Sequence, residues 1–286
     1  MILIADGGST KVDWVVMSTN GELLAKTQTK SLNPFFASEE TLASRISESS
    51  ELLTIKDEVT QIYFYGADCN ESWSAEKLDH VFNLIFKNAK TQIKEDTYAA
   101  VFAMAKTPSI VCILGTGSNV CYFDGSSVRV EVDSLGYVMM DEASGNYFGK
   151  KLIKDYYYRI MPEEERSRFQ SSYETNSKII KKNIYGNENP NRYLASFAPF
   201  VFEQEKSSYC QELLYKGVRK FFERRILLFK EAKSVPIHFV GSIAYFSSNI
   251  IHRVANEQSL KVGEIARKPI DGLAEHHRQF CSGGVL

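Results

Sequence analysis

The stretch DGGSTK at residues 6–11 joins two short apolar runs, residues 2–5 and 12–17, in a chain of 286 residues. Both runs are rich in Ile and Val, as β-strands are. A tight hairpin needs about two turn residues, but this connection holds two adjacent glycines and two hydroxyl side chains. Glycine lets the backbone approach a ligand closely and leaves N–H groups free to bind an anion. We therefore predict a strand–turn–strand unit with an anion-binding turn.

A third apolar run, residues 23–27, follows the dipeptide Asn20-Gly21. Asn-Gly between apolar runs is typical of a type I′ hairpin turn, in which both central residues have positive φ. The chain is thus expected to begin with a meander of three strands.

The same order of features returns about a hundred residues later. The stretch LGTGSN at residues 114–119 joins runs at 110–114 and 120–123, and a further strand is predicted at 128–132. This similarity indicates a weak internal repeat.

The remaining segments alternate between strand and helix patterns. We predict helices at 38–53, from Ser74 onward, at 97–105 and at 243–254, strands at 61–65 and 235–240, and mostly helical structure over 145–233. Such alternation favours an α/β architecture. Two lobes are expected, residues 1–106 and 107–286, with the last helix able to return to the N-terminal lobe.

Composition excludes several classes of protein. Lys and Arg number 34 and Asp and Glu 35, a net charge of -1, so no nucleic-acid partner is expected. No run of 18 apolar residues predicts a membrane span, and Asp6 comes too early for the apolar region of a signal peptide, so a cytoplasmic location is expected. The five cysteines lack paired spacing, which predicts neither disulfides nor a zinc or iron–sulfur site.

Neither glycine turn matches the P-loop pattern GxxxxGK[ST] or the dinucleotide pattern GxGxxG. Residues 6–11 and 114–119 instead resemble the first and second phosphate motifs of the acetate kinase, sugar kinase, Hsp70 and actin superfamily, and residues 240–244 are similar to its adenosine motif. The resemblance implies a two-lobe, actin-like ATPase (ribonuclease H-like) fold with duplicated mixed sheets flanked by helices.

Within this superfamily the chain resembles the N-acetylglucosamine kinase group of the BadF/BadG/BcrA/BcrD ATPase family. The segment GYVMMDEASG at residues 136–145 is similar to the GWGxxxGDEGSG segment of that group. Three residues depart from it: Met140 and Ala143 stand where the group has glycine, and Tyr137 where it has tryptophan. These departures concern the identity of the sugar more than the use of ATP.

The resemblance implies ATP and Mg²⁺ as cofactors and assigns each candidate residue a role. Asp96 would be the general base and Asp6 a Mg²⁺ ligand. The nucleotide would be bound by Gly7, Gly8, Ser9, Thr10, Lys11, Gly115, Thr116, Gly241 and Ser242. The sugar would be bound by Asn33, Asp96, Gly117, Ser118, Gly136 and Asp141.

Purely structural roles compete with these assignments. Asp6 could cap the following turn, Lys11 could be a solvated charge, and Asp96 could be the N-cap of the following helix. Glu142 is either a second Mg²⁺ or sugar contact or a charge at a helix N-terminus. For Tyr245 and Phe246 we favour a place in the core over a place in an adenine pocket.

The resemblance implies ATP-dependent phosphorylation of an amino sugar, in the first place N-acetylglucosamine to N-acetylglucosamine 6-phosphate. A kinase for a related sugar such as N-acetylmuramic acid or glucosamine, an ATPase that activates a partner enzyme, and a nucleotide-dependent sugar sensor are the alternatives. The expected partners are the sugar and ATP, and a homodimer is left open.

Overall fold

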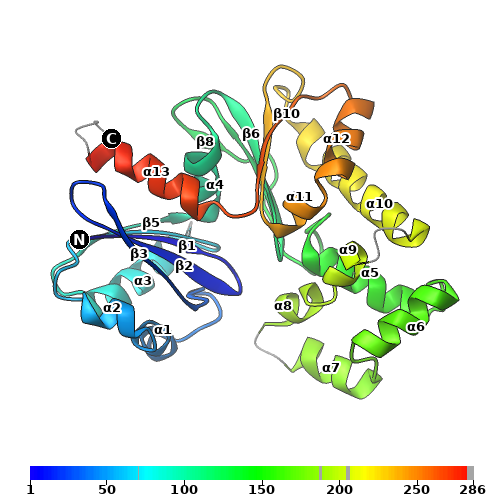
Figure 1. The fold of residues 1–286 in the computed structure, drawn as a ribbon, viewed down its shortest axis with the longest axis horizontal. Coiled ribbons are helices and arrows are strands. Elements are labelled where there is room, and N and C mark those ends of the chain that lie inside the picture. The colour runs from blue at the N-terminus through cyan, green and yellow to red at the C-terminus, as the bar shows by residue number, and fades with distance from the viewer. Residues whose placement is uncertain (70, 187–188, 204–206, 282–286) are drawn as a thin grey trace. The chain divides into compact units, whose positions relative to one another are not determined.

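The computed structural model describes residues 1–69, 71–186, 189–203 and 207–281, drawn in Figure 1. They form two compact units. The first comprises residues 1–106 and the C-terminal segment from Lys268, and the second comprises residues 107–267. Within the described residues no helix is both long enough and apolar enough to cross a lipid bilayer.

The first unit contains a five-stranded mixed sheet in the order β3-β2-β1-β4-β5. Its strands are β1 (Ile2–Gly7), β2 (Lys11–Met17), β3 (Leu23–Lys30), β4 (Gln61–Gly66) and β5 (Lys90–Glu95). The first three form the predicted antiparallel meander, and β4 and β5 run parallel to β1. Successive side chains of β1 enter opposite cores because a strand alternates its faces.

Helices cover both faces of this sheet (Figure 1). They are α1 (Glu39–Ser47), α2 (Ser50–Thr54), α3 (Ser72–Ile85), α4 (Asp96–Met104) and α13 (Ile270–Cys281). Leu3 of β1 belongs to a core with Leu42 of α1 and Phe82 of α3. Ile4 belongs to the opposite core, with Leu273 of α13.

The second unit repeats this topology, with the sheet order β10-β9-β6-β7-β8. Its strands are β6 (Ser109–Leu114), β7 (Ser118–Phe123), β8 (Val128–Arg129), β9 (Ile237–Val240) and β10 (Val262–Ala266). The antiparallel strands β6, β7 and β8 correspond to β1, β2 and β3, and β9 and β10 are added in parallel. The expected duplication of mixed sheets is confirmed.

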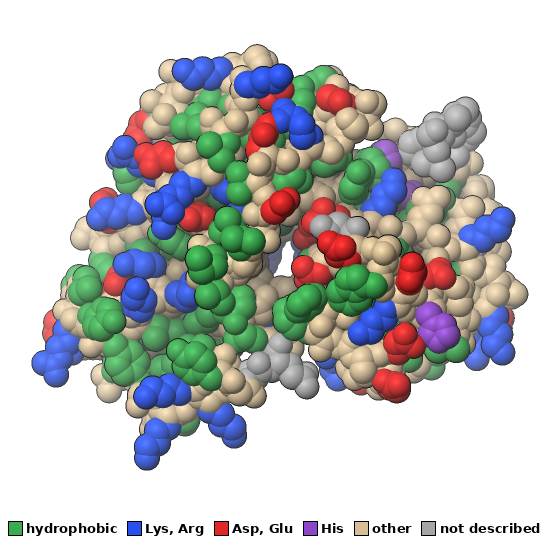
Figure 2. Space-filling model, turned by 180° about the vertical axis from the view of Figure 1, so that it is seen from behind, with side chains coloured by type: hydrophobic (Ala, Val, Ile, Leu, Met, Phe, Trp, Pro, Cys, Tyr) green, Lys and Arg blue, Asp and Glu red, His purple; other side chains and the backbone are tan. Residues whose placement is uncertain are grey.

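Most helices of the second unit lie between β8 and β9 in sequence. They are α5 (Gly145–Tyr157), α6 (Glu163–Ser172), α7 (Ser177–Tyr185), α8 (Pro190–Ala195), α9 (Pro199–Glu203), α10 (Ser208–Arg224) and the 3₁₀ turn η1 (Ile226–Leu228), followed later by α11 (Ser242–Phe246) and α12 (Ser248–Glu257). Aromatic side chains such as Phe169, Phe197 and Phe200 fill their core. Charged side chains of both signs are spread over the face shown in Figure 2, in keeping with the net charge of -1.

Three local predictions are corrected. The hairpin at Asn20-Gly21 is not type I′, because Gly21 alone of the pair has positive φ (87°) and the Ser18 N–H donates to the Glu22 carbonyl across a longer loop. The helix predicted over 38–53 is broken, since the Ser49 hydroxyl caps a second helix. The strand predicted at 128–132 ends at Arg129.

The C-terminal helix α13 places two histidines against the first unit's sheet. The hydroxyl of Tyr65 and Nε2 of His277 share a hydrogen bond of 2.9 Å. The ring of His276 stacks on Phe102 of α4 at 4.3 Å between centroids. The buried His277 therefore belongs to the core that α13 completes.

We predict that His277 makes the first unit sensitive to acid. Burial lowers the pKa of His277 from its ordinary 6.5 to about 3, so the unfolded chain gains a proton below about pH 6.5 while the folded chain does not. This residue should reduce the free energy of unfolding by about 2 kcal/mol between pH 7 and pH 5. Urea unfolding at both pH values measures the loss. It should shrink in His277→Gln but not in His80→Gln, a change at an exposed histidine of the same unit.

Candidate active site

The carboxyl ends of the parallel strands β1, β4 and β5 meet at one edge of the first sheet. Gly7 pairs with Gly66, and Gly66 pairs with Glu95. Asp6 is the next-to-last residue of β1, Asp68 follows β4 and Asp96 follows β5. Ligands of open α/β sheets bind at this edge, so the fold gathers aspartates where a ligand is expected.

These carboxylates disfavour one another's charge. Burial, together with the negative charge of the neighbouring Asp13, raises the pKa of Asp6 to about 7. Burial likewise raises the pKa of Asp96 to about 7, with contributions from Glu95, Asp6 and Asp68. A cation at this edge would offset the accumulated negative charge.

This edge of the sheet fits Mg²⁺ only if oxygen atoms from outside the protein also coordinate the ion. Among the described residues there is no group of three or more His, Cys, Asp or Glu side chains that could hold a metal ion. Mg²⁺ commonly keeps several waters and binds one or two carboxylates together with substrate phosphates. Asp6, a hard oxygen donor, meets that requirement.

The structure removes the helix-cap role that competed for Asp96. Glu95 occupies the N-cap position of α4 and makes no side-chain capping bond. Asp96 is the first residue inside the helix, and its side chain is half-buried among other carboxylates. Its raised pKa suits a proton acceptor near neutral pH.

The first glycine turn, residues 7–11, is held by few internal bonds. The Gly8 N–H donates to the Lys11 carbonyl at 3.0 Å, and the Ser31 hydroxyl donates to the Gly8 carbonyl at 2.8 Å. Within the described residues the N–H groups of Ser9 and Thr10 have no protein acceptor. Such N–H groups can donate to an anion, and anion binding by this turn stays a prediction.

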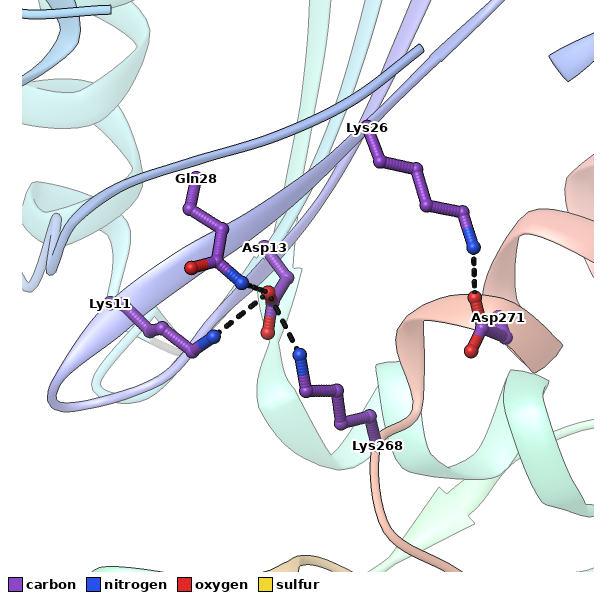
Figure 3. Close-up of polar contacts among 6 residues, drawn as sticks. All are labelled: Lys11, Asp13, Lys26, Gln28, Lys268 and Asp271. Atoms are coloured by element: carbon purple, nitrogen blue, oxygen red, sulfur yellow. Dashed lines mark hydrogen bonds and ion pairs between the residues drawn. The ribbon is translucent and has the colours of Figure 1, made fainter.

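Two further predicted residues are tied to neighbours in this unit. Asn33 donates its side-chain N–H to Asp68 at 2.8 Å, which links it to the carboxylate edge. Lys11 forms an ion pair with Asp13 at 3.1 Å, shown in Figure 3. Lys11 is therefore not a freely solvated charge.

In the second unit Asp141 lies against the second glycine turn, residues 115–118. One carboxylate oxygen accepts the Ser118 N–H at 3.2 Å, and the other accepts the Asn146 side-chain N–H at 2.7 Å. Asp141 is only 6% exposed, and its burial raises its pKa. Its backbone is left-handed, with φ 67°, a strained conformation that is often kept at functional sites.

Two buried polar atoms beside Asp141 lack a partner in the described part of the chain. They are the hydroxyl of Ser118 and the side-chain oxygen of Asn146. A buried polar atom without a hydrogen bond is costly and therefore rare. A hydroxyl-bearing ligand at Asp141 would supply an acceptor for the Ser118 hydroxyl and a donor for the Asn146 side-chain oxygen.

The backbone geometry of the segment before α5 explains why the family pattern has glycine where this chain has Ala143. Ala143 has φ 57°, which is where glycine would be unstrained.

Glu142 points toward α10, with the guanidinium of Arg224 at 3.5 Å and the ammonium of Lys220 at 3.8 Å. Gly136 has φ 72° and accepts backbone bonds from Met139 and Met140; no hydrogen bond of the described residues joins it to Asp141.

Sequence reasoning missed Arg225, the buried residue that supports this segment. Its guanidinium donates to the side-chain oxygen of Asn119 and to the Val132 carbonyl, both at 3.3 Å, and contacts the sulfur of Met140 at 3.9 Å. Burial lowers the pKa of Arg225. An arginine after a helix in sequence gives no local sign of such a role.

The predicted adenosine motif meets the second glycine turn. Gly241 has φ 120° and ψ 162°, and a Cβ there would lie 2.2 Å from the Leu114 carbonyl oxygen. Ser242 begins α11 directly after it. Tyr245 and Phe246 are 50% and 52% exposed, so the expectation that they belong to the core is wrong.

We predict that a side chain at Gly117 destabilises the protein. A Cβ at Gly117 would lie 2.9 Å from a carboxylate oxygen of Asp141, whereas one at Gly115 would meet nothing within 4 Å. Gly117→Ala should lower the free energy of unfolding by about 1–2 kcal/mol, and Gly115→Ala should change it by less than about 1 kcal/mol. Chemical denaturation of the two variants measures the difference, and equal values would contradict the predicted clash.

Duplicated mixed sheets with a glycine turn after the first strand of each are the architecture of the actin-like ATPases, the class that includes sugar kinases. The chain matches no protein-family model and none of the curated proteins. Its fold does match solved structures closely.

One solved structure, described as a "Putative N-acetylglucosamine Kinase" from Porphyromonas gingivalis, is 31% identical to this chain, with a TM-score of 0.90 over 98% of this chain and 99% of its own. A protein of the same description from Chromobacterium violaceum is 15% identical (TM-score 0.64; 96% and 98% covered). A glucokinase of the ROK family from Streptomyces griseus, in complex with glucose and AMPPNP, is 12% identical (TM-score 0.63; 96% and 97% covered). The last two share the fold.

The identity to the Porphyromonas gingivalis protein extends over nearly the whole of both chains. The chain therefore belongs to the N-acetylglucosamine kinase-like family, and it is a sugar kinase.

Proposed function

We propose that this kinase transfers the γ-phosphoryl group of ATP to the 6-hydroxyl of N-acetylglucosamine. The observation that carries the proposal is Asp96, a half-buried carboxylate with its pKa raised to about 7 at the carboxyl edge of the first sheet. The description of the relative from Porphyromonas gingivalis supports an amino sugar as the acceptor.

Asp96 is the proposed general base. Its carboxylate accepts the proton of the attacking hydroxyl while the sugar oxygen forms its bond to the γ-phosphorus and the bond from phosphorus to the leaving oxygen breaks. Phosphoryl transfer depends on positioning and on charge stabilisation, and a single carboxylate suffices to orient the acceptor. The products are ADP and the sugar 6-phosphate.

The nucleotide is assigned to the two glycine turns. The N–H groups of Ser9 and Thr10, which have no acceptor within the described residues, support a role for residues 7–11 with phosphate. Gly115 and Thr116 take the corresponding role in the second unit. Gly241 and Ser242 would receive the adenosine, since the absence of a Cβ at Gly241 lets the chain pass close to Leu114.

Mg²⁺ is assigned to Asp6, and when bound it would neutralise phosphate charge. Asp6 would hold the ion directly or through water. The buried, mutually repelling carboxylates at this edge support a cation there.

The sugar is assigned to Asn33, Asp96, Gly117, Ser118, Gly136 and Asp141. Asp141 can accept hydrogen bonds from two adjacent sugar hydroxyls, because each of its oxygens has a lone pair beyond the bond it already accepts. The unpartnered hydroxyl of Ser118 supports a polar ligand beside it.

The experiment that tests the proposal measures ADP release with Mg·ATP and a panel of N-acetylglucosamine, N-acetylmannosamine, N-acetylmuramic acid, glucosamine and glucose. Turnover highest with N-acetylglucosamine is expected. Higher turnover with another member of the panel would make that sugar the proposed acceptor and leave the proposed mechanism unchanged. ADP release that no sugar raises would overturn the proposal in favour of a sensor or an activator of a partner enzyme.

A cytoplasmic location belongs to the proposal, because ATP is its co-substrate.

A further inference from the structure

Asp13 gathers three donors on one oxygen beside the first glycine turn (Figure 3). Its Oδ1 lies 3.1 Å from Nζ of Lys11 and 3.3 Å from Nζ of Lys268, and it accepts a 2.5 Å hydrogen bond from Nε2 of Gln28. Asp13 lies directly opposite Asp6 in the register of β1 and β2. The cluster thus adjoins both the turn and the proposed Mg²⁺ ligand.

This cluster carries more positive charge than its carboxylate can balance. Lys11 and Lys268 supply two ammonium groups against the single charge of Asp13, a surplus of one. The Asp13 side chain is 14% exposed, whereas those of Lys11 and Lys268 are 39% and 42% exposed. The ammonium groups can therefore turn toward a ligand in solvent without leaving a buried site.

The charge of Lys268 also reaches Asp6. Lys268 and then Lys11 lower the pKa of Asp6, against the larger effect of burial. Lys268 is thus electrostatically coupled to the carboxylate that immediately precedes the glycine turn, although the two residues are 262 positions apart in sequence.

We propose that Lys268 is a phosphate-binding residue of the nucleotide site, which together with Lys11 donates to the phosphate oxygens of ATP while Asp13 keeps both lysines within reach. This inference rests on the proposed function, because it places the nucleotide phosphates at residues 7–11. An ammonium group is a suitable point charge for phosphate.

A purely structural role is the competing explanation, and the chain contains a matched control for it. Lys26 of β3 pairs with Asp271 of α13 at 2.5 Å. Like the pair of Lys268 and Asp13, it joins the first hairpins to the C-terminal segment (Figure 3). The pair of Lys26 and Asp271 is one cation with one anion and has no surplus charge to offer a ligand.

The test compares Lys268→Gln with Lys26→Gln, using isothermal titration calorimetry of the full chain with ADP and with adenosine. Loss of one ammonium–phosphate contact should weaken ADP binding about tenfold in Lys268→Gln. Adenosine binding should be unchanged, and Lys26→Gln should bind ADP as the original protein does. Lys268→Arg should recover most of the ADP affinity, since it keeps the charge.

Several outcomes would overturn the inference. These are ADP affinity unchanged in Lys268→Gln, an equal loss in Lys26→Gln, or an equal loss for adenosine. Thermal unfolding of each variant checks that the fold is kept. If Lys268→Gln is unfolded, Lys268→Arg provides the test. The inference is contradicted if Lys268→Arg binds ADP no more tightly than it binds adenosine. Absence of ADP binding by the original protein would overturn it as well. Because the titration contains no sugar, failure of the sugar panel alone leaves the inference standing.

Discussion

Asp96→Asn is expected to lower kcat for sugar phosphorylation by about 10³-fold. The amide keeps the size of the carboxylate but cannot accept the proton of the attacking hydroxyl. It also removes one of the mutually repelling charges at the carboxyl edge of the sheet, so the folded state should be at least as stable. Initial rates at saturating ATP and sugar measure kcat, and urea unfolding measures stability.

Glu95→Gln is the matched control. Glu95 is the neighbour of Asp96 and contributes to the same cluster of charge, and its carboxylate accepts a hydrogen bond from Thr97 at 3.3 Å. We expect this variant to keep kcat within about tenfold of the original. Equal losses in the two variants would assign the effect to the charge cluster and contradict the role of Asp96 as base.

The pH profile gives a second check on Asp96. Its raised pKa of about 7 means that the base is protonated below neutral pH in the free enzyme. The kcat/KM for the sugar should therefore fall about tenfold per pH unit below pH 7 and level off above it. Measurement between pH 5.5 and pH 9 at fixed ionic strength tests this, and a flat profile would count against a base with this pKa.

The second large effect is expected at Gly241. Gly241→Ala should reduce the free energy of unfolding by about 3 kcal/mol or more, because backbone strain and a close contact act together. The added Cβ would lie 2.2 Å from the Leu114 carbonyl oxygen, and the backbone at φ 120° and ψ 162° belongs to a region that is essentially restricted to glycine. Nucleotide binding should be lost with it, because Leu114 precedes the second glycine turn.

Gly125→Ala separates the contact from the backbone strain. Gly125 also has positive φ, 110°, but a Cβ there would be 3.9 Å from Pro108. Its replacement should cost about 1–2 kcal/mol. Equal stability losses in Gly125→Ala and Gly241→Ala, measured by chemical denaturation, would contradict the close approach at Leu114.

The glycine turns and the meanders around them could be predicted because their signals are local. The alternating strand pattern, the adjacent glycines and the hydroxyl residues of each unit all occur within a short stretch of sequence. Strand β5 was missed because it is an edge strand without a buried residue, and its sequence KTQIKE is mostly polar. Helix α13 was predicted only as a last helix that could return to the N-terminal lobe.

The candidate site was harder to predict, because its properties depend on long-range contacts. Asp96 and Asp6 could be selected by resemblance, but their raised pKa values arise from burial and from carboxylates that four separate strands bring together. The convergence of Lys11 and Lys268 on Asp13 joins residues 255 positions apart. Similarly, no local pattern indicates that Arg225 supports the segment around Met140.

The chain order of the two units has a consequence for biosynthesis. The second unit is one continuous segment, whereas the first begins at Met1 and is completed only by the residues after Arg267. Until α13 emerges from the ribosome, the apolar face formed by Ile2, Ile4 and Val15 lacks its partner Leu273. The later-made second unit can therefore reach its native structure before the earlier-made first unit, the reverse of the usual N-terminal-first order.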